Sequence, residues 1–336
     1  MIKEAINFLV NGTNLSEDDM SGAMRDIMEG NASDAQIASF LTALRIKGET
    51  VPEITGAAKV MREKATKINA PEYTVDTCGT GGDMSHTFNI STTTAIIAAA
   101  CGVPVAKHGN RSVSSRSGSA DVLEALGVKI SLKPEDVEEC LKATGFGFLF
   151  APLFHPAMKY AVGPRREMGI RTIFNILGPL TNPAQAKRQV LGVYSDELTE
   201  PIANVLGNLG AKHAFIVHGE DGLDEMTITG RTKISELKDG RVNTYYITPE
   251  DLGFIRAKKE DLLGGTAEEN AKITLDILNG KSGPKRDIAL INSAAALMVG
   301  DIAKSFSDAI EKASNVIDSG AALKKLEEIK VVTNRL

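Results

Sequence analysis

A glycine-rich stretch between a predicted strand and a predicted helix carries the first residues whose types and spacing indicate chemistry. Residues 73–75 have a strand pattern, Gly79, Gly81 and Gly82 follow, and the Ala/Ile-rich residues 92–101 are long enough for a helix. Glycine adopts positive φ and lets backbone N–H groups approach an anion without a Cβ in the way. A helix N-terminus adds unpaired N–H donors and a partial positive charge. Together these elements predict a phosphate-binding loop.

The alternative interpretation of this stretch is a tight strand-to-helix turn without a ligand. Asp83 and the polar side chains of Asn89, Ser91 and Thr92 at the predicted helix start favour phosphate binding instead. The pattern does not match the dinucleotide-binding GxGxxG motif, and it lacks the Gly-Lys followed by Ser or Thr of nucleoside triphosphatases. Both of those motif classes are therefore excluded.

A second polar loop, residues 107–115, follows a predicted strand at 103–106. It contains one Lys, one His, one Arg and four hydroxyl or amide side chains around Gly109. Solvated loops are often polar, so a surface loop is the alternative. Open α/β sheets bind ligands at the carboxyl ends of their strands, where this loop and the loop 79–83 both belong. We therefore predict that the two loops face one crevice.

An adjacent pair of carboxylates, Asp224 and Glu225, follows a predicted strand at 214–217. Taken alone, the pair is more typical of an acidic surface turn than of a metal site. Next to a polyphosphate the preference reverses, because Mg²⁺ is held by one or two carboxylates together with substrate oxygens. The hydroxyl of Ser91 could supply a further ligand.

Other reactive side chains give weaker signals. Arg165, Arg166 and Arg171 have the guanidinium geometry that binds a carboxylate or phosphate, although any one of them could be an ordinary surface arginine. Cys78 beside the glycine loop is predicted to be a buried small side chain, because no base is paired with it. The five histidines, at positions 86, 108, 155, 213 and 218, do not have metal-ligand spacing.

The overall composition is that of a globular protein with a substantial core. The chain has 336 residues, 43% hydrophobic content and a net charge of −5, which argues against a broad nucleic-acid-binding surface. Three widely spaced cysteines do not form a disulfide framework or a zinc motif, so a reducing cytoplasm fits best. The N-terminus lacks a signal-peptide pattern, and no run approaches the roughly 18 apolar residues of a spanning helix.

The elements that must position these side chains fall into two groups. Residues 1–66 have the pattern of four helices, with capping signals at Ser16, Ser33 and Thr50. From residue 73 onward, short strands alternate with helices, which predicts a mostly parallel central sheet flanked by helices. Further strands are predicted at 128–130, 146–150, 189–193, 214–217 and 242–247, with helices at 119–126, 134–144, 198–209, 266–279, 287–299 and 302–318.

The expected organisation is a small N-terminal helical domain, residues 1–70, and a large α/β domain, residues 71–336. The hinge is expected at 67–72. Residues 156–183 have a helical, polar pattern with a tight turn at 177–183, and we expect this inserted segment to dock on the N-terminal helices.

In these motifs the sequence resembles the anthranilate phosphoribosyltransferase family. The matching segments are 79–83, 87–92, 107–115, 163–167 with 172–183, and 223–225, and the resemblance covers nearly the whole chain. It implies a helical domain plus an α/β domain, and transfer of the phosphoribosyl group of phosphoribosyl pyrophosphate (PRPP) to the amine of anthranilate, with Mg²⁺, in tryptophan biosynthesis. One departure is Met84-Ser85-His86, where the family is expected to have a glycine after Asp83.

The resemblance also assigns site residues. For anthranilate these are Gly79, Asn110 and Arg165, and for the metal Ser91, Asp224 and Glu225. A catalytic base stays unassigned, with His108 the nearest candidate by sequence. The residues implied for PRPP are Gly79, Gly82, Asp83, Thr87, Asn89, Ile90, Ser91, Thr92, Lys107, His108, Gly109, Asn110, Arg111, Ser112, Val113, Ser114, Ser115 and Ser119.

The family is usually a homodimer joined through its helical domains, and association with the amidotransferase subunit of anthranilate synthase is left open. Neither nucleic acid nor membrane is an expected partner.

Two alternative functions predict different sequence features. A pyrimidine nucleoside phosphorylase shares the architecture but fits the segments 107–115 and 177–183 poorly. A non-catalytic relative that binds nucleic acid should have a basic groove and lack the pair Asp224 and Glu225.

Overall fold

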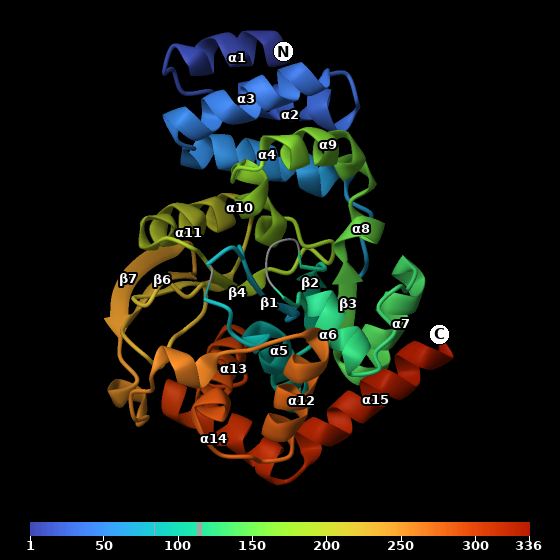
Figure 1. Ribbon diagram of the computed structural model, residues 1–336, viewed down its shortest axis with the longest axis vertical. Coiled ribbons are helices and arrows are strands. Elements are labelled where there is room, and N and C mark those ends of the chain that lie inside the picture. Colours follow the sequence, from blue (N-terminus) through green and yellow to red (C-terminus); the bar gives the residue numbers. More distant parts are fainter. Residues whose placement is uncertain (84, 113–115) are drawn as a thin grey trace.

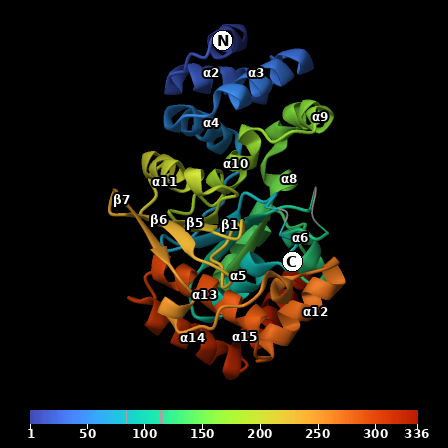
Figure 2. The same ribbon diagram turned by 60° about the vertical axis from the view of Figure 1, so that its left-hand side comes forward.

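The computed structural model describes residues 1–83, 85–112 and 116–336. A layer of helices at the N-terminal end lies above an α/β domain, and both views show the separation (Figures 1 and 2). The first four helices are α1 (Ile2–Val10), α2 (Glu17–Met28), α3 (Asp34–Lys47) and α4 (Val51–Lys64).

The predicted helix starts are confirmed by their capping contacts. The Ser16 side chain accepts a hydrogen bond from the Asp19 N–H. Capping boxes pair Ser33 with Gln36 and Thr50 with Glu53. A capping box stabilises a helix because it satisfies N–H groups that have no partner within the helix.

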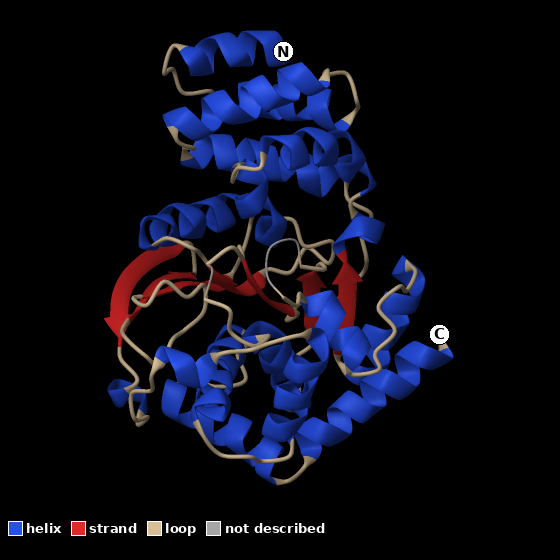
Figure 3. Ribbon diagram, viewed as in Figure 1, coloured by secondary structure: helices blue, strands red, loops and turns tan. Residues whose placement is uncertain are grey.

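The α/β domain is built on a seven-stranded sheet with the order β3-β2-β1-β4-β5-β6-β7 (Figure 3). Neighbouring strands are parallel from β3 to β5, and β6 and β7 add an antiparallel edge. The strands are β1 (Val75–Gly79), β2 (Val105–Gly109), β3 (Phe146–Phe150), β4 (Arg188–Gly192), β5 (His213–Gly219), β6 (Thr232–Lys238) and β7 (Arg241–Ile247). The predicted fold class is confirmed.

Helices cover both faces of this sheet (Figure 3). Below it in Figure 1 lie α5 and the C-terminal helices, and above it lie α10 and α11. The helices after α4 are α5 (Ile90–Ala100), α6 (Ser119–Ala125), α7 (Pro134–Thr144), α8 (Ala151–Phe154), α9 (Lys159–Met168), α10 (Ile173–Leu180), α11 (Thr199–Asn208), α12 (Ala267–Leu278), α13 (Pro284–Val299), α14 (Phe306–Asp318) and α15 (Ala321–Arg335), with short 3₁₀ helices at Pro156–Met158, Asp196–Leu198, Glu250–Leu252 and Lys259–Leu262.

The hydrophobic core has two main parts, one on each face of the sheet. The first packs α5, α13 and α15 under strand residues such as Val75 and Phe215. The second is continuous from Met24 and Leu44 of the helical layer, through Leu177 of α10, to the opposite face of the sheet. Because one apolar cluster spans both layers, the helical layer is packed onto the α/β domain.

The segment between β3 and β4 joins the two layers. Helix α9 contacts α2 and α3, and α10 contacts α4 and α3. Arg62 of α4 donates from Nε to the Leu180 carbonyl oxygen at 2.7 Å. The prediction of a tight turn at 177–183 is partly wrong, because α10 continues through Pro179 to Leu180 and the chain turns only after Leu180.

The structure differs from the sequence prediction at residues 128–130 and in two missed elements. Residues 128–130 are not a strand. Val128 and Ile130 are buried in the core, but the backbone there bonds to α15, where Thr333 Oγ1 accepts from the Lys129 N–H. The sequence prediction also missed β6 and α15. In the described part of the chain no helix is long and apolar enough to cross a membrane.

Candidate active site

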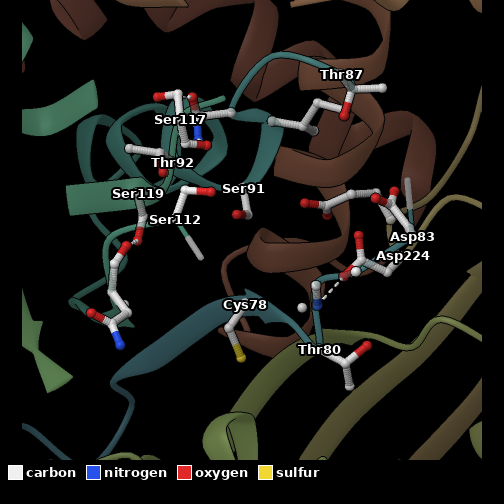
Figure 4. Close-up of a pocket in the computed structure, with 18 of the residues that line it drawn as sticks. Cys78, Thr80, Asp83, Thr87, Ser91, Thr92, Ser112, Ser117, Ser119 and Asp224 are labelled. Carbon is white, nitrogen blue, oxygen red and sulfur yellow. Dashed lines mark hydrogen bonds between the residues drawn. The ribbon is translucent and has the colours of Figure 1, made fainter. Parts of the chain in front are cut away.

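A cavity of about 380 Å³ opens at the carboxyl ends of β1 and β2 (Figure 4). Its walls come from the β1–α5 loop, the first turn of α5, the β2–α6 loop, Asn175 of α10, and the acidic pair after β5. The predicted residues that line it are Gly79, Gly82, Asp83, Thr87, Asn89, Ile90, Ser91, Thr92, Lys107, His108, Gly109, Asn110, Arg111, Ser112, Ser119, Asp224 and Glu225. The two loops predicted to face one crevice therefore do so.

Some predicted residues are not part of this wall, and others were missed. Val113, Ser114 and Ser115 lie outside the described residues, as does Met84 in the Met84-Ser85-His86 departure. Arg165 does not line the cavity, whereas Ser117 and Asn175 do. Ser117 had a weak signal, because it comes just before the predicted helix 119–126. Asn175 lies in the family-matching segment 172–183, but it was not among the residues assigned to the site, because only the packing of α10 brings it to the sheet.

The glycine loop packs against the carboxylate of Asp224. The Gly81 N–H donates to Asp224 Oδ2 at 2.7 Å, and a Cβ added to Gly79 would lie 2.4 Å from the same oxygen. Gly81 and Gly82 have φ of +67° and +74°, which side chains rarely adopt. Glycine is therefore needed at positions 81 and 82 for the backbone conformation, and at position 79 for the close approach of Asp224. In this conformation the Gly81 N–H is donated to Asp224.

The start of α5 forms the opposite wall of the cavity. The helix begins at Ile90, two residues earlier than the sequence predicts, and Asn89 is its N-cap residue without a side-chain capping bond. The Ser91 backbone N–H favours the ionised form of Glu225 and so opposes the rise of its pKa. The buried ammonium of Lys107 donates to the Thr77 carbonyl oxygen at 2.5 Å and to Ser91 Oγ at 3.2 Å. A polar wall of N–H, hydroxyl and ammonium groups results.

The carboxyl groups of Asp224 and Glu225 have strongly raised pKa values. Burial, followed by the nearby charge of Asp83, raises the pKa of Asp224 to about 7. Burial and the neighbouring Asp224 raise the pKa of Glu225 well above its usual range, and the cation of Lys107 opposes that shift. Figure 4 shows Asp83 and Asp224 side by side at one edge of the cavity. Clustered carboxylates of this kind favour binding of a cation, which would relieve their repulsion.

These oxygens suit Mg²⁺ if a substrate shares the ion. Within residues 1–83, 85–112 and 116–336, no three or more His, Cys, Asp or Glu side chains are grouped so that they alone could hold a metal. Mg²⁺ is commonly held by one or two carboxylates together with substrate phosphates and water. Asp224 and Glu225 with the Ser91 hydroxyl therefore fit a metal that arrives with a phosphorylated substrate.

Two buried histidines lie on the α8 side of β2. His108 Nε2 and His155 Nε2 are 3.2 Å apart, and the rings are tilted by 51°. Burial, together with the neighbouring His155, lowers the pKa of His108 to about 3, and burial lowers that of His155 to about 4. Both rings are therefore neutral at pH 7. A base with so low a pKa is a poor proton acceptor, which weakens the case for His108 as the catalytic base.

The arginines of the inserted segment take different positions. The Arg165 guanidinium carbon lies 5.1 Å from the ring centroid of Phe174, and burial lowers the pKa of Arg165. Arg171 reaches the glycine loop, where its Nη2 donates to the Gly82 carbonyl oxygen. Its guanidinium carbon is 4.6 Å from the centroid of Tyr194. Arg166 is exposed.

Comparison with known proteins identifies the family. Residues 72–323 match the family described as "Glycosyl transferase family, a/b domain", and residues 3–65 match its helical bundle domain. Anthranilate phosphoribosyltransferase from Acetivibrio thermocellus is 61% identical over 335 residues, which cover 99% of this chain and 97% of the relative. The chain belongs to the anthranilate phosphoribosyltransferase family. The family member from Symbiobacterium thermophilum is 54% identical, over 100% of this chain and 98% of its own.

Solved structures of the anthranilate phosphoribosyltransferase family have the same fold. The enzyme from Thermus thermophilus superposes with a TM-score of 0.93 at 42% identity, over 98% of this chain and 99% of its own. The Saccharomyces cerevisiae enzyme in complex with PRPP and Mg superposes with a TM-score of 0.90 at 29% identity, over 100% and 98%. The family resemblance read from the sequence motifs is confirmed.

Proposed function

We propose that the protein transfers the 5-phosphoribosyl group of PRPP to the amine of anthranilate, giving N-(5-phosphoribosyl)anthranilate and pyrophosphate in tryptophan biosynthesis. The observation that carries this proposal is one cavity that joins a glycine loop, a helix N-terminus and a buried acidic pair in a chain of this family. In the reaction the ribose C1–O bond to pyrophosphate breaks, the leaving group keeps the electron pair, and the amine nitrogen bonds to C1 and loses a proton.

The described residues suit a substrate that develops charge in this way. Negative charge accumulates on the departing pyrophosphate while the ribose becomes cationic, so fixed donors that tighten in the transition state lower the barrier. We assign the phosphates to the glycine loop and the first turn of α5, with the ammonium of Lys107 nearby. No covalent nucleophile is needed, and the raised pKa of Cys78, caused mainly by burial, fits a purely structural thiol.

Mg²⁺ is the proposed cofactor, held by Asp224, Glu225 and Ser91 together with substrate oxygens. When bound, it supplies Lewis-acid stabilisation to the leaving pyrophosphate. The buried carboxylates support this assignment because burial and mutual repulsion raise their pKa values, and a bound cation would stabilise their ionised forms. The yeast relative was solved in complex with PRPP and Mg.

For the aromatic acid we propose Gly79, Asn110 and Arg165. Asn110 is exposed at the cavity wall. Its Oδ1 accepts from the Arg111 N–H at 2.8 Å, so its Nδ2 is the group that could donate to a carboxylate. Arg165 lies outside that wall, stacked on Phe174, so its contribution requires anthranilate to bind on the side of the inserted segment. The yeast relative was also solved in complex with 4-fluoroanthranilate.

The oligomeric state, domain limits and location are also proposals. We propose domains at 1–70 and 71–336, with 156–183 packed on the former, and a homodimer through the helical domain. Exposed apolar side chains on α1 and α3 support that interface, since Phe8, Val10 and Ile46 are 49%, 68% and 82% exposed.

The three free thiols suit a cytoplasmic location. Association with the amidotransferase subunit of anthranilate synthase stays a prediction.

The deciding experiment incubates the protein with PRPP, Mg²⁺ and a panel of aromatic amines and nucleobases, and reads the products by mass spectrometry. N-(5-phosphoribosyl)anthranilate should be the dominant product, and it should require both PRPP and Mg²⁺. A parallel incubation of pyrimidine nucleosides with phosphate tests the phosphorylase alternative. Release of free base in that incubation, without product from anthranilate, would overturn the proposed function.

A further inference from the structure

The segment just before α12 packs against the back of the glycine loop, outside the main cavity wall. Thr87 and Leu263 form an antiparallel bridge, and the Gly264 N–H donates to the His86 carbonyl oxygen at 2.9 Å. A Cβ added to Gly264 would lie 2.6 Å from the backbone nitrogen of Phe88. Glycine at this position therefore allows the two backbones to touch.

Asn270, in the first turns of α12, connects this segment to the cavity wall. Its side chain is only 2% exposed. Its Oδ1 accepts from the Gly265 N–H at 2.8 Å, and its Nδ2 donates to Asn89 Oδ1 at 2.9 Å. Buried amides keep such bonds because an unpaired donor or acceptor costs free energy.

Asn89 is thereby held from two sides. Its Oδ1 also accepts from Ser117 Oγ at 3.3 Å, and its Nδ2 donates to the Ser117 carbonyl oxygen at 3.2 Å. These contacts join the start of α5, the end of the β2–α6 loop and α12. They also explain why Asn89 makes no side-chain capping bond to its own helix.

The orientation of Asn89 matters because this residue lines the cavity, whereas Asn270 does not. Within the described residues, one of the two Nδ2 hydrogens of Asn89 is donated to Ser117. The other makes no hydrogen bond to a described residue, so it could be donated to a ligand in the cavity that Asn89 lines. Since Asn270 is a donor to Oδ1, it fixes which end of the Asn89 amide is the acceptor and which the donor.

We infer that Asn270 is a positioning residue for the phosphates of PRPP, acting through Asn89 without touching the substrate. This inference rests on the proposed function, because it names a further determinant of the same site. It also gives residues 264–270 a role: they hold the end of the β2–α6 loop and the start of α5 in fixed positions relative to each other.

The sharpest variant is Asn270→Asp. A carboxylate of nearly the same shape can still accept from the Gly265 N–H, but it cannot donate to Asn89 Oδ1 and repels it instead. The KM and the calorimetric Kd for PRPP should rise about tenfold, the effect of losing one well-placed hydrogen bond. The KM for anthranilate should change much less. Asn270→Ser, whose hydroxyl is too short to reach both partners, gives a second test if Asn270→Asp folds poorly.

Thr274→Val is the matched control, one turn further along α12. It removes the hydrogen bond between Thr274 Oγ1 and Thr93 Oγ1, 2.9 Å long, which also joins α12 to α5. Thr93 Oγ1 donates to the backbone carbonyl oxygen of Asn89 at 3.2 Å, so this variant leaves the contacts of the Asn89 side-chain amide in place. Thr274→Val should lower thermal stability and leave the ratio of the two KM values unchanged. If Asn270→Asp and Thr274→Val alter both KM values alike, Asn270 merely docks the helix and the inference is overturned.

A double-mutant cycle with Asn89→Ala tests the route of the effect. If Asn270 acts through Asn89, the Asn270→Asp change should have little further effect on the PRPP Kd once Asn89 is alanine. A full, additive loss in the Asn89→Ala background would overturn the inference. If the wild-type protein forms product and the Asn270→Asp variant binds PRPP as tightly as the wild type, the inference is overturned and the proposed function stands. Wild-type protein that neither binds nor uses PRPP overturns the proposed function as well.

Discussion

The Nε2 atoms of His108 and His155 lie 3.2 Å apart, so one imidazole must donate to the other. Two protonated rings at this distance would repel each other, and burial removes the water that would solvate them. The pKa values of about 3 and about 4 follow from that environment. The pair is therefore a neutral, hydrogen-bonded part of the wall at physiological pH.

This pair predicts a stability loss in acid. Both folded-state pKa values are lowered, so the unfolded chain binds protons more readily between about pH 6.5 and pH 4. The stabilising contribution is complete above pH 6.5 and decreases as pH falls, by up to about 1.4 kcal/mol per pH unit for each ring. Urea unfolding from pH 7.5 to pH 4.5 should give a shallower loss for His155→Gln than for the wild type. Parallel curves would contradict the assignment.

Arg165→Ala should weaken the use of anthranilate far more than PRPP binding. A charge-assisted carboxylate contact is worth about 1.5 to 3 kcal/mol, so the KM for anthranilate should rise roughly 10- to 150-fold. The neighbouring Arg166→Ala, which removes an exposed guanidinium, is the control and should behave as the wild type. Steady-state kinetics with each substrate varied in turn measure both effects. Equal losses for the two substrates would remove Arg165 from the anthranilate site.

Gly82→Ala should reduce PRPP binding much more than it reduces stability. Its φ of +74° disfavours any side chain, so the loop must shift or carry strain of about 1 kcal/mol. Gly240→Ala is the matched control, because Gly240 has φ of +75° in the β6–β7 turn with nothing near its added Cβ. Both variants should lose similar thermal stability, and only Gly82→Ala should lose PRPP affinity. Equal kinetics in the two would support a purely structural turn.

Gly79→Ala should act through a different contact. The added Cβ would lie 2.4 Å from Asp224 Oδ2, so the acidic pair must move. We expect a raised Mg²⁺ requirement in addition to lost turnover, measured as activity against metal concentration. A variant with normal Mg²⁺ dependence would show that the Gly79–Asp224 contact has no bearing on the metal.

The double variant Asp224→Asn, Glu225→Gln should separate a metal role from a general-base role. Activity should fall at ordinary Mg²⁺ and recover in part when Mg²⁺ or Mn²⁺ is raised, whereas loss of a base would not be rescued by metal. Because burial raises the pKa of Asp224 to about 7 in the folded protein, stability falls as pH rises from about 4, the pKa of an unfolded Asp, to about 7, and the full loss is present above pH 7. Metal-free, the double variant should therefore be more stable than the wild type at pH 8.

The exposed pair Asp196 and Glu197 provides the control for that experiment. Asp196→Asn, Glu197→Gln removes the same two charges from a surface 3₁₀ helix and should change neither metal dependence nor stability. Titration of Mg²⁺ against all three proteins at several pH values decides the question. An unchanged metal dependence in the double variant at 224 and 225 would exclude those residues from metal binding.

Ile46→Glu should dissociate the proposed homodimer. Ile46 is 82% exposed on α3, and a charge there opposes burial against a second copy. Light scattering after size-exclusion chromatography should give a monomer for this variant and a dimer for the wild type. Ile255→Glu, at a residue 89% exposed in the α/β domain, is the control and should stay dimeric. A wild-type monomer would remove the helical-domain interface.

The sequence by itself determined the features that depend on near neighbours in the chain. Helix starts follow from capping pairs such as Ser33 with Gln36, which are three residues apart. The glycine loop, the polar start of α5 and the loop after β2 follow from strand-to-loop-to-helix order, and in parallel sheets that order alone brings them to one edge. Most of the cavity wall could therefore be predicted.

Only the tertiary structure decided the features that depend on distant residues. The hydrogen bond from Gly81 to Asp224 joins residues 143 apart, and the one from Asn270 to Asn89 joins residues 181 apart. Residues 128–130 have the pattern of a strand, yet the Lys129 N–H donates to Thr333 of α15 and not to a neighbouring strand. Protonation depends on burial and on neighbouring charge, which no local pattern contains. For that reason the sequence could name Asp224, Glu225 and His108, but only the fold shows two carboxylates that resist ionisation and a histidine that stays neutral.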